Sequence, residues 1–198
     1  MNEPDPEVVR AAQDGDINAF ELLVRHYQGD VWRLSLQLVR DQALADDVTQ
    51  EAFVRVYRFL SRYRGESKFS TWLFSISRNC AMDELRKAGR RKRTRDRLEA
   101  EPEPESSSQD FRSGIEVREA VGALPLDLRE PIVLIDMFGC SYKEVSRILE
   151  VPLGTVKSRV HRGRELLVAD LLEASTEVDG SRSSRRSAEA EEAKHERS

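Results

Sequence analysis

The sequence predicts an all-α protein with two small helical domains, an N-terminal helical bundle and a C-terminal helix-turn-helix, joined by a flexible acidic linker. Apolar residues recur at helical spacing from residue 20 to residue 80, and again from residue 115 onward. Between these stretches, residues 99–110 (EAEPEPESSSQD) contain no cation and no apolar side chain larger than Ala. Such a segment cannot bury enough surface to offset its chain entropy.

The expected domain organisation has five parts. They are an N-terminal extension (1–15), a first domain (16–95), a disordered linker (96–113), a second domain (114–172) and a disordered tail (173–198). The tail has mixed charge and almost no large apolar residue, which is typical of disorder.

Charge is distributed unevenly along the chain. The net charge of −4 by itself argues against a nucleic-acid partner. However, residues 1–60 carry six Lys and Arg against eleven Asp and Glu, whereas residues 62–97 carry twelve against four. We therefore expect one acidic face and one basic face.

Several classes of chemistry lack a signal in the sequence. Cys80 and Cys140 are the only cysteines and have no partner at metal-ligand spacing, which favours a reduced, cytoplasmic chain. No phosphate-binding glycine loop, placed nucleophile or metal cluster is found. No apolar run approaches the ~18 residues of a membrane span. We predict a soluble protein that is not an enzyme and has no cofactor or metal.

The first domain begins with three predicted helical runs. Residues 5–15 are short and polar, and Asp16 or Asn18 then caps a helix. Gly29 is expected to break or bend that helix before a second run over 31–39. A third run covers 43–60. Its predicted buried side is Ala45, Val48, Phe53, Val56, Tyr57 and Leu60, and its predicted exposed edge is Asp46, Asp47, Gln50 and Glu51.

Residues 63–91 combine aromatic side chains, a short polar loop and arginines. Phe69, Leu73, Ile76 and Cys80 form an apolar stripe, while Trp72, Asn79 and Arg86 share another face at seven-residue spacing. Aromatic rings stack unpaired bases and cations neutralise phosphates, so the second face suits single-stranded nucleic acid. Burial of Trp72 and Phe74 in a core is the alternative interpretation.

The second domain contains a predicted helix-turn-helix over residues 141–167. Ser141 and Glu144 form a capping box, and residues 150–152 form the turn. The next helix starts near Leu153 or Gly154 and is expected to bury Val156, Val160, Leu166 and Leu167. The outward side chains are Thr155, Lys157, Ser158, Arg159, His161 and Arg162. They are placed to reach base edges and phosphates, and a helical hairpin that merely has a basic surface is the alternative.

Four strings in this order resemble the extracytoplasmic-function class of bacterial RNA polymerase sigma factors, over roughly residues 16–172. The first two are ADDVTQEAF (45–53) and YRGESKFSTWLFSISRN (63–79). The others are LPLDLR (124–129) and the helix-turn-helix string that runs from Gly139 to Arg159.

The resemblance implies a role for each motif. Residues Asp46, Asp47, Gln50, Glu51 and Phe53 would bind core RNA polymerase at its β′ clamp, with the β flap as a second contact. Promoter −10 DNA would be melted and bound by Tyr63, Arg64, Gly65, Ser67, Lys68, Phe69, Trp72, Asn79 and Arg86, with a flipped base held by the loop, Tyr63 and Asn79. Residues Thr155, Lys157, Ser158, Arg159, His161 and Arg162 would read the −35 element. An anti-sigma factor is the implied regulatory partner.

The chain departs from the sigma-factor pattern at a few positions. Ser75 and Ile76 stand where housekeeping sigma factors carry a tandem tryptophan wedge, which implies weaker melting and stricter promoter choice. Glu150 stands at a common turn glycine, so we expect a left-handed backbone there. The competing functions are a polymerase-independent helix-turn-helix regulator and an RNA-binding protein that uses residues 62–97.

Overall fold

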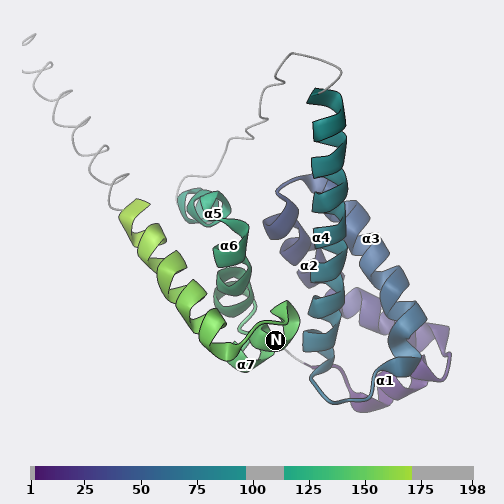
Figure 1. The fold of residues 1–198 in the computed structure, drawn as a ribbon. Helices are drawn as coiled ribbons and strands as arrows, with labels where there is room; N and C mark the ends of the chain where they lie inside the picture. Colours follow the sequence, from purple (N-terminus) through teal and green to yellow (C-terminus); the bar gives the residue numbers. More distant parts are fainter. Residues whose placement is uncertain (1–2, 97–113, 171–198) are drawn as a thin grey trace, which may run out of the picture.

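The computed structural model describes residues 3–96 and 114–170, with side chains up to residue 91 and from residue 119. The predicted linker from residue 97 on and the predicted tail lie outside the described residues. Every regular element in the described ranges is helical, which confirms the all-α prediction (Figure 1). The elements are α1 (Pro6–Gln13), α2 (Ile17–Val39), α3 (Gln42–Phe59), η1 (Leu60–Arg62), α4 (Phe69–Asp96), α5 (Gly114–Ala123), α6 (Leu126–Ile132), η2 (Val133–Met137), α7 (Tyr142–Leu149) and a last helix over residues 153–170.

The N-terminal bundle consists of α1 to α4. Of the two candidate caps for α2, the structure selects Asp16, whose side chain accepts hydrogen bonds from the backbone N–H groups of Asn18 and Ala19. Asp41 caps α3 in the same way. Facing sides of the helices bury a continuous apolar core, whose largest members include Leu23, Tyr27, Leu34, Leu38, Leu60, Leu73 and Phe74.

Two predictions about the bundle were wrong. Residues 5–15 contain helix α1, because Asp5 accepts a hydrogen bond from the Glu7 N–H, Pro6 fits the first turn, and Val9 and Ala12 are buried three residues apart. Gly29 does not interrupt α2, which runs unbroken through it. Glycine costs a helix about 1 kcal/mol, less than burying a large side chain on the same helix contributes.

Two apolar side chains predicted to be buried are exposed. Tyr57 is 52% exposed and packs edge-on against Phe20, with ring centroids 5.0 Å apart. Leu166 is 44% exposed, because the last helix turns a different face inward. That face includes Gly163, where a Cβ atom would lie 2.4 Å from Cδ1 of Ile132, so the two helices approach too closely for a side chain.

Apart from the exposure of Leu166, the helix-turn-helix prediction is confirmed. Ser141 and Glu144 form both hydrogen bonds of the capping box, and the inward side chains Val145, Ile148 and Leu149 are buried. Glu150 has the expected left-handed backbone, with φ of 57°. The Ser146 hydroxyl donates to the Val151 carbonyl oxygen at 2.6 Å and so supports the turn.

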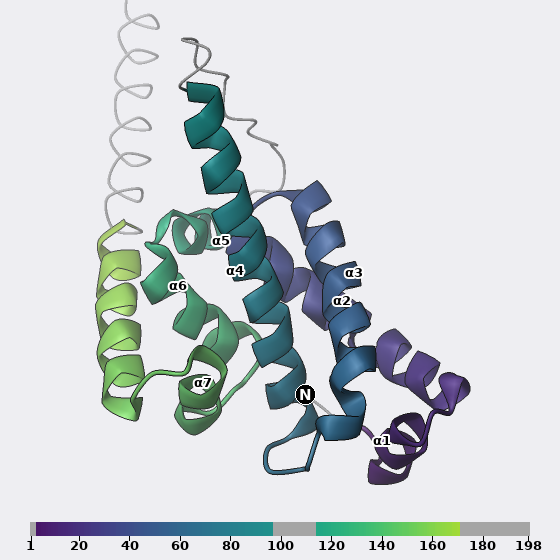
Figure 2. The same cartoon turned by 45° about the vertical axis from the view of Figure 1, so that its right-hand side comes forward.

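The two regions pack directly against each other, with α4 between the other bundle helices and the C-terminal helices (Figure 2). Phe74 is fully buried, and its ring centroid lies 5.1 Å from that of Phe138. Arg78 on α4 forms an ion pair with Glu130 on α6 at 2.7 Å. Arg129 donates to the carbonyl oxygens of Leu38 and Gly122, so the arginine of the LPLDLR string ties α5 and α6 to the end of α2.

Candidate functional site

The loop between η1 and α4 is held in one shape by its own hydrogen bonds. The Tyr63 N–H donates to the Leu60 carbonyl oxygen, and the Tyr63 hydroxyl donates to the Ser67 carbonyl oxygen at 2.6 Å. Gly65 has φ of 71°, a backbone region that disfavours other residues. Burial raises the pKa of the Tyr63 hydroxyl, so it remains a donor at neutral pH.

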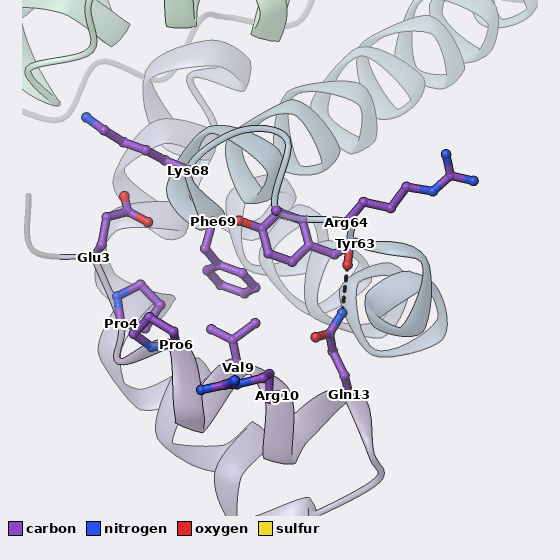
Figure 3. A pocket seen from close by; sticks show the side chains of 11 residues that line it. Glu3, Pro4, Pro6, Val9, Arg10, Gln13, Tyr63, Arg64, Lys68 and Phe69 are labelled. Atoms are coloured by element: carbon purple, nitrogen blue, oxygen red, sulfur yellow. Dashed lines mark hydrogen bonds between the residues drawn. The ribbon is translucent and has the colours of Figure 1, made fainter.

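This loop borders a cavity of about 510 Å³ that faces α1 (Figure 3). Five of the predicted −10 residues meet there: Tyr63, Arg64, Gly65, Lys68 and Phe69. The opposite wall consists of Glu3, Pro4, Pro6, Val9, Arg10 and Gln13. Sequence reasoning missed this wall, because residues 5–15 were interpreted as a polar segment outside the domain.

The aromatic side chains of this region separate into core and accessible rings. Phe69 and Phe74 are buried, which fits the core interpretation for Phe74. Trp72 is only half-buried, and its ring centroid lies 5.1 Å from that of Tyr63. Tyr63 and Trp72 therefore form an aromatic pair beside the cavity, where an unpaired base can stack.

Asn79 and Arg86 lie outside the cavity. Asn79 is ten residues beyond Phe69, or about 15 Å along α4, and is exposed. Its side-chain oxygen accepts a hydrogen bond from Arg78, and Arg86 pairs with Asp83 at 3.1 Å. The structure thus does not bring Asn79 together with Tyr63 in one base pocket.

A second recess, of about 660 Å³, lies between α2 and α3. Gln50 and Phe53 are the two predicted polymerase-binding residues that line it. The others are Ile17, Phe20, Val24, Gln28, Thr49, Val54, Tyr57 and Arg58. We call this recess the α2/α3 groove. Its apolar residues recur at helical spacing. Core residues show the same spacing, so the sequence pattern alone does not distinguish an exposed groove from a buried core.

The carboxylates on the acidic edge of α3 differ in whether they bond to other side chains. Asp46 accepts a hydrogen bond from the Trp32 indole at 2.7 Å. Glu51 pairs with Arg55, which also binds Asp83 on α4 at 2.9 Å; the hydrogen bonds to these two carboxylates raise the pKa of Arg55. Asp47 is exposed. Asp46 therefore joins α3 to α2, whereas Glu51 pairs within α3 with Arg55, the residue that joins α3 to α4.

The last helix presents its predicted DNA-reading residues on one side. Val156 and Val160 are buried and anchor the helix against the domain. The outward set has Lys157, Ser158, His161 and Arg162 exposed and Thr155 and Arg159 half-exposed. These six side chains are accessible on the outer surface of the helix, as predicted; their contact with DNA stays a prediction.

The helix-turn-helix contacts the loop of the first region. Lys68 Nζ lies 2.8 Å from Glu144 Oε1, and Arg147 donates to the Glu66 carbonyl oxygen at 3.4 Å. Burial acts to raise the pKa of Glu144, but hydrogen bonds from Lys68 and Ser141 outweigh it and hold that pKa at about 2. One carboxylate thus completes a capping box and binds a loop cation.

Glu144→Gln should lower the free energy of unfolding in a pH-dependent way. Because the folded pKa of Glu144 is depressed, its stabilisation is complete above about pH 4.5 and is lost as the pH falls toward about 2. The difference between wild type and variant, measured by urea unfolding, should shrink across that window. Lys68→Met provides the control that separates the ion pair from the cap. A pH-independent difference would contradict this account.

Neither cysteine lies in an environment that favours a thiolate. Burial raises the pKa of both Cys80 and Cys140 to about 11. Among the described residues, no group of three or more His, Cys, Asp or Glu side chains is arranged to hold a metal ion. No helix in residues 3–96 or 114–170 has the length and hydropathy that crossing a bilayer requires.

Comparison with known proteins identifies both halves of the chain. A sigma-70 region 2 family model matches residues 23–91, and a sigma-70 region 4 model matches residues 115–167. The RNA polymerase sigma-H factor of Pseudomonas aeruginosa is 36% identical over 179 residues, covering 83% of this chain and 92% of that protein. The ECF RNA polymerase sigma-E factor of Escherichia coli K12 is 38% identical over 176 residues, covering 82% and 92%.

Solved structures of sigma factors share the fold over most of the chain. The sigma factor RpoE of Bartonella quintana, in complex with the anti-sigma factor NepR, has a TM-score of 0.67 and 26% identity, covering 78% of this chain and 98% of that one. CnrH, in complex with the cytosolic domain of CnrY, has a TM-score of 0.64 and 27% identity, covering 86% and 97%. The chain belongs to the extracytoplasmic-function family of RNA polymerase sigma factors.

Proposed function

We propose that this sigma factor uses three separate surfaces: the α2/α3 groove for core RNA polymerase, the loop cavity for the −10 element and the last helix for the −35 element. The observation that carries the −10 assignment is the cavity lined by Tyr63 and by the loop cations Arg64 and Lys68, with Trp72 packed against the Tyr63 ring. A protein that only binds duplex DNA has no need of such a site. Removing a base from its stack costs a few kcal/mol, which stacking and hydrogen bonds must recover.

The α2/α3 groove is the proposed contact with the polymerase clamp. Apolar side chains that remain exposed here include Ile17, Val54 and Tyr57, at 60%, 44% and 52%. Gln50 and Phe53 line the same recess, so two of the five predicted residues coincide with an unfilled apolar surface. Such a surface, rimmed by polar groups, is typical of a protein-binding site.

Lys157→Ala and Arg162→Ala should each lower the affinity for −35 DNA by about tenfold. The changes in sequence specificity and salt dependence should show which residue contacts a base and which a phosphate. A residue that reads a base relaxes specificity at one position, whereas a phosphate contact weakens all sequences and reduces the salt slope by about one. Binding to a library of duplexes, measured at several salt concentrations, checks this. Arg25→Ala, on the exposed surface of α2, is the control. Unchanged binding by both variants would remove the last helix from this role.

The compact arrangement must open on a promoter. Here Arg147 touches the loop at Glu66, whereas −10 and −35 elements lie about 25 base pairs apart, or roughly 80 Å along B-DNA. The match to the NepR-bound sigma factor spans 78% of this chain, more than either region alone contains, with a TM-score of 0.67, which supports a similar arrangement of the two regions. We infer that an anti-sigma factor binds and stabilises this compact form.

The protein acts as a polymerase subunit in the cytoplasm and not as a catalyst or an independent regulator. Support comes from its family and from the groove, which a self-sufficient repressor does not require. Purified protein should co-elute with core RNA polymerase and direct initiation from promoter templates. Sequence-specific protection of a palindromic duplex in the absence of polymerase would instead favour the independent regulator.

A further inference from the structure

Helix α1 lies outside the residues that the region 2 family model matches, yet it forms one wall of the loop cavity. Val9 on α1 and Phe69 on α4 point toward one another across it (Figure 3). Both are buried, at 6% and 2% exposed, and make an apolar floor. Arg10 lies on the α1 side of the cavity, and Arg64 and Lys68 on the loop side. The Glu3 carboxylate also lines the cavity, and Lys68 is paired with Glu144 at 2.8 Å. An apolar floor flanked by Arg10 and Arg64 fits the face of a base attached to a phosphate backbone.

Gln13, the last residue of α1, fixes the start of the loop. Its Nε2 donates to the carbonyl oxygen of Leu60 at 3.0 Å and to that of Tyr63 at 2.7 Å. These two carbonyls lie at either end of η1, directly after α3, where backbone oxygens lose their helical partners. A single amide group therefore ties the exit of α3 to α1.

The hydrogen bond from Gln13 also determines the orientation of Tyr63. The backbone carbonyl of Tyr63 is held by Gln13, and its hydroxyl is held by the Ser67 carbonyl oxygen at the far side of the loop. Its ring packs against those of Phe69 and Trp72, with centroid distances of 5.6 and 5.1 Å, and those two rings also contact each other at 5.8 Å. Without the first anchor, the backbone that carries this ring is free to shift.

We propose that Gln13 is a positioning residue for −10 recognition: it holds Tyr63 and the loop in the shape that selects a captured base, and α1 supplies the second wall of that pocket. This inference rests on the proposed role of the loop cavity. Gln13 itself need not touch the base, since its side chain acts through the two carbonyl oxygens.

The test uses holoenzyme reconstituted from the full chain and core RNA polymerase, mixed with single-stranded oligonucleotides randomised across the −10 positions. Sequencing the bound fraction gives the enrichment of each base. Gln13→Met keeps the side-chain length but removes both donors, and should lower enrichment at the captured position about tenfold. Gln42→Met is the matched control, because Gln42 is exposed at the other end of α3, about 27 Å from η1.

A purely structural role for Gln13 would lower the thermal midpoint and the amount of bound DNA but leave the base preference intact, and that result would overturn the proposal. If Gln13→Met fails to fold, Gln13→Glu replaces it in the test. Glutamate keeps the shape of the side chain but lacks the N–H donors, so this variant should also lose the base preference. Glycine at all three of Glu66, Ser67 and Lys68 tests the loop itself. Unchanged preference there refutes the loop cavity as the −10 site, whereas loss there with wild-type preference in Gln13→Met refutes only this inference.

Discussion

Val54→Arg should raise the Kd for core RNA polymerase by about 100-fold, equivalent to about 3 kcal/mol, while the folded structure is retained. Val54 lines the α2/α3 groove and is 44% exposed, so a longer side chain has room in the free protein. In the proposed complex the polymerase clamp covers the groove, and the guanidinium would be buried without a partner. An unpaired buried charge costs several kcal/mol.

Leu22→Arg is the matched control for this experiment. Leu22 lies on α2, is 56% exposed and does not line the groove, so the same change of chemistry occurs outside the proposed contact. Fluorescence anisotropy with labelled sigma factor gives both affinities, and circular dichroism verifies folding. Equal affinities for Val54→Arg and wild type would mean that the groove does not contact polymerase. A similar loss in both variants would indicate a general charge effect.

The helix-turn-helix could be predicted because its signals are local. A capping box spans four residues, and the inward positions Val145, Ile148 and Leu149 follow one helical period. Even the left-handed Glu150 was expected, since the turn needs that backbone whichever residue occupies it. Local hydrogen bonds and periodicity depend only on neighbours in the chain, which a sequence displays.

The groove and the cavity were harder to predict because they depend on how helices meet. Phe20 and Tyr57 have the spacing of core residues, and only the packing of α2 on α3 shows that they line an open recess. Gln13 reaches Tyr63 across fifty positions of sequence. In a short polar segment a glutamine carries no signal of such a contact, so the role of Gln13 was not predictable, although Asp5 and Pro6 are local signals for the start of α1.

The contacts between the two regions were also outside what the sequence could predict. Arg78 and Glu130 are separated by 52 residues, and each lies in a stretch that contains other charged side chains. Selecting that pair requires the relative orientation of α4 and α6. The resemblance supplied a function for each region, but it left open whether the regions touch.

Arg78→Ala should therefore destabilise the packing of the two regions by about 3 kcal/mol, a cost typical of breaking a buried ion pair. The Glu130 side chain is only 4% exposed and that of Arg78 is 23% exposed, so removing the arginine leaves a buried carboxylate without its cation. Urea unfolding should report the loss, and hydrogen exchange in α6 and η2 should accelerate. Small-angle scattering should show a larger radius of gyration, because the regions separate.

Two controls determine whether burial causes this effect. Arg25→Ala breaks an ion pair with Glu21 in which both side chains are more than half exposed, and it should cost less than about 1 kcal/mol. Arg78→Met combined with Glu130→Leu removes both charges and should restore most of the stability, since apolar residues of similar volume replace buried pairs without penalty. If the double variant is as unstable as Arg78→Ala, the pair acts through its specific geometry and not through the desolvated charge.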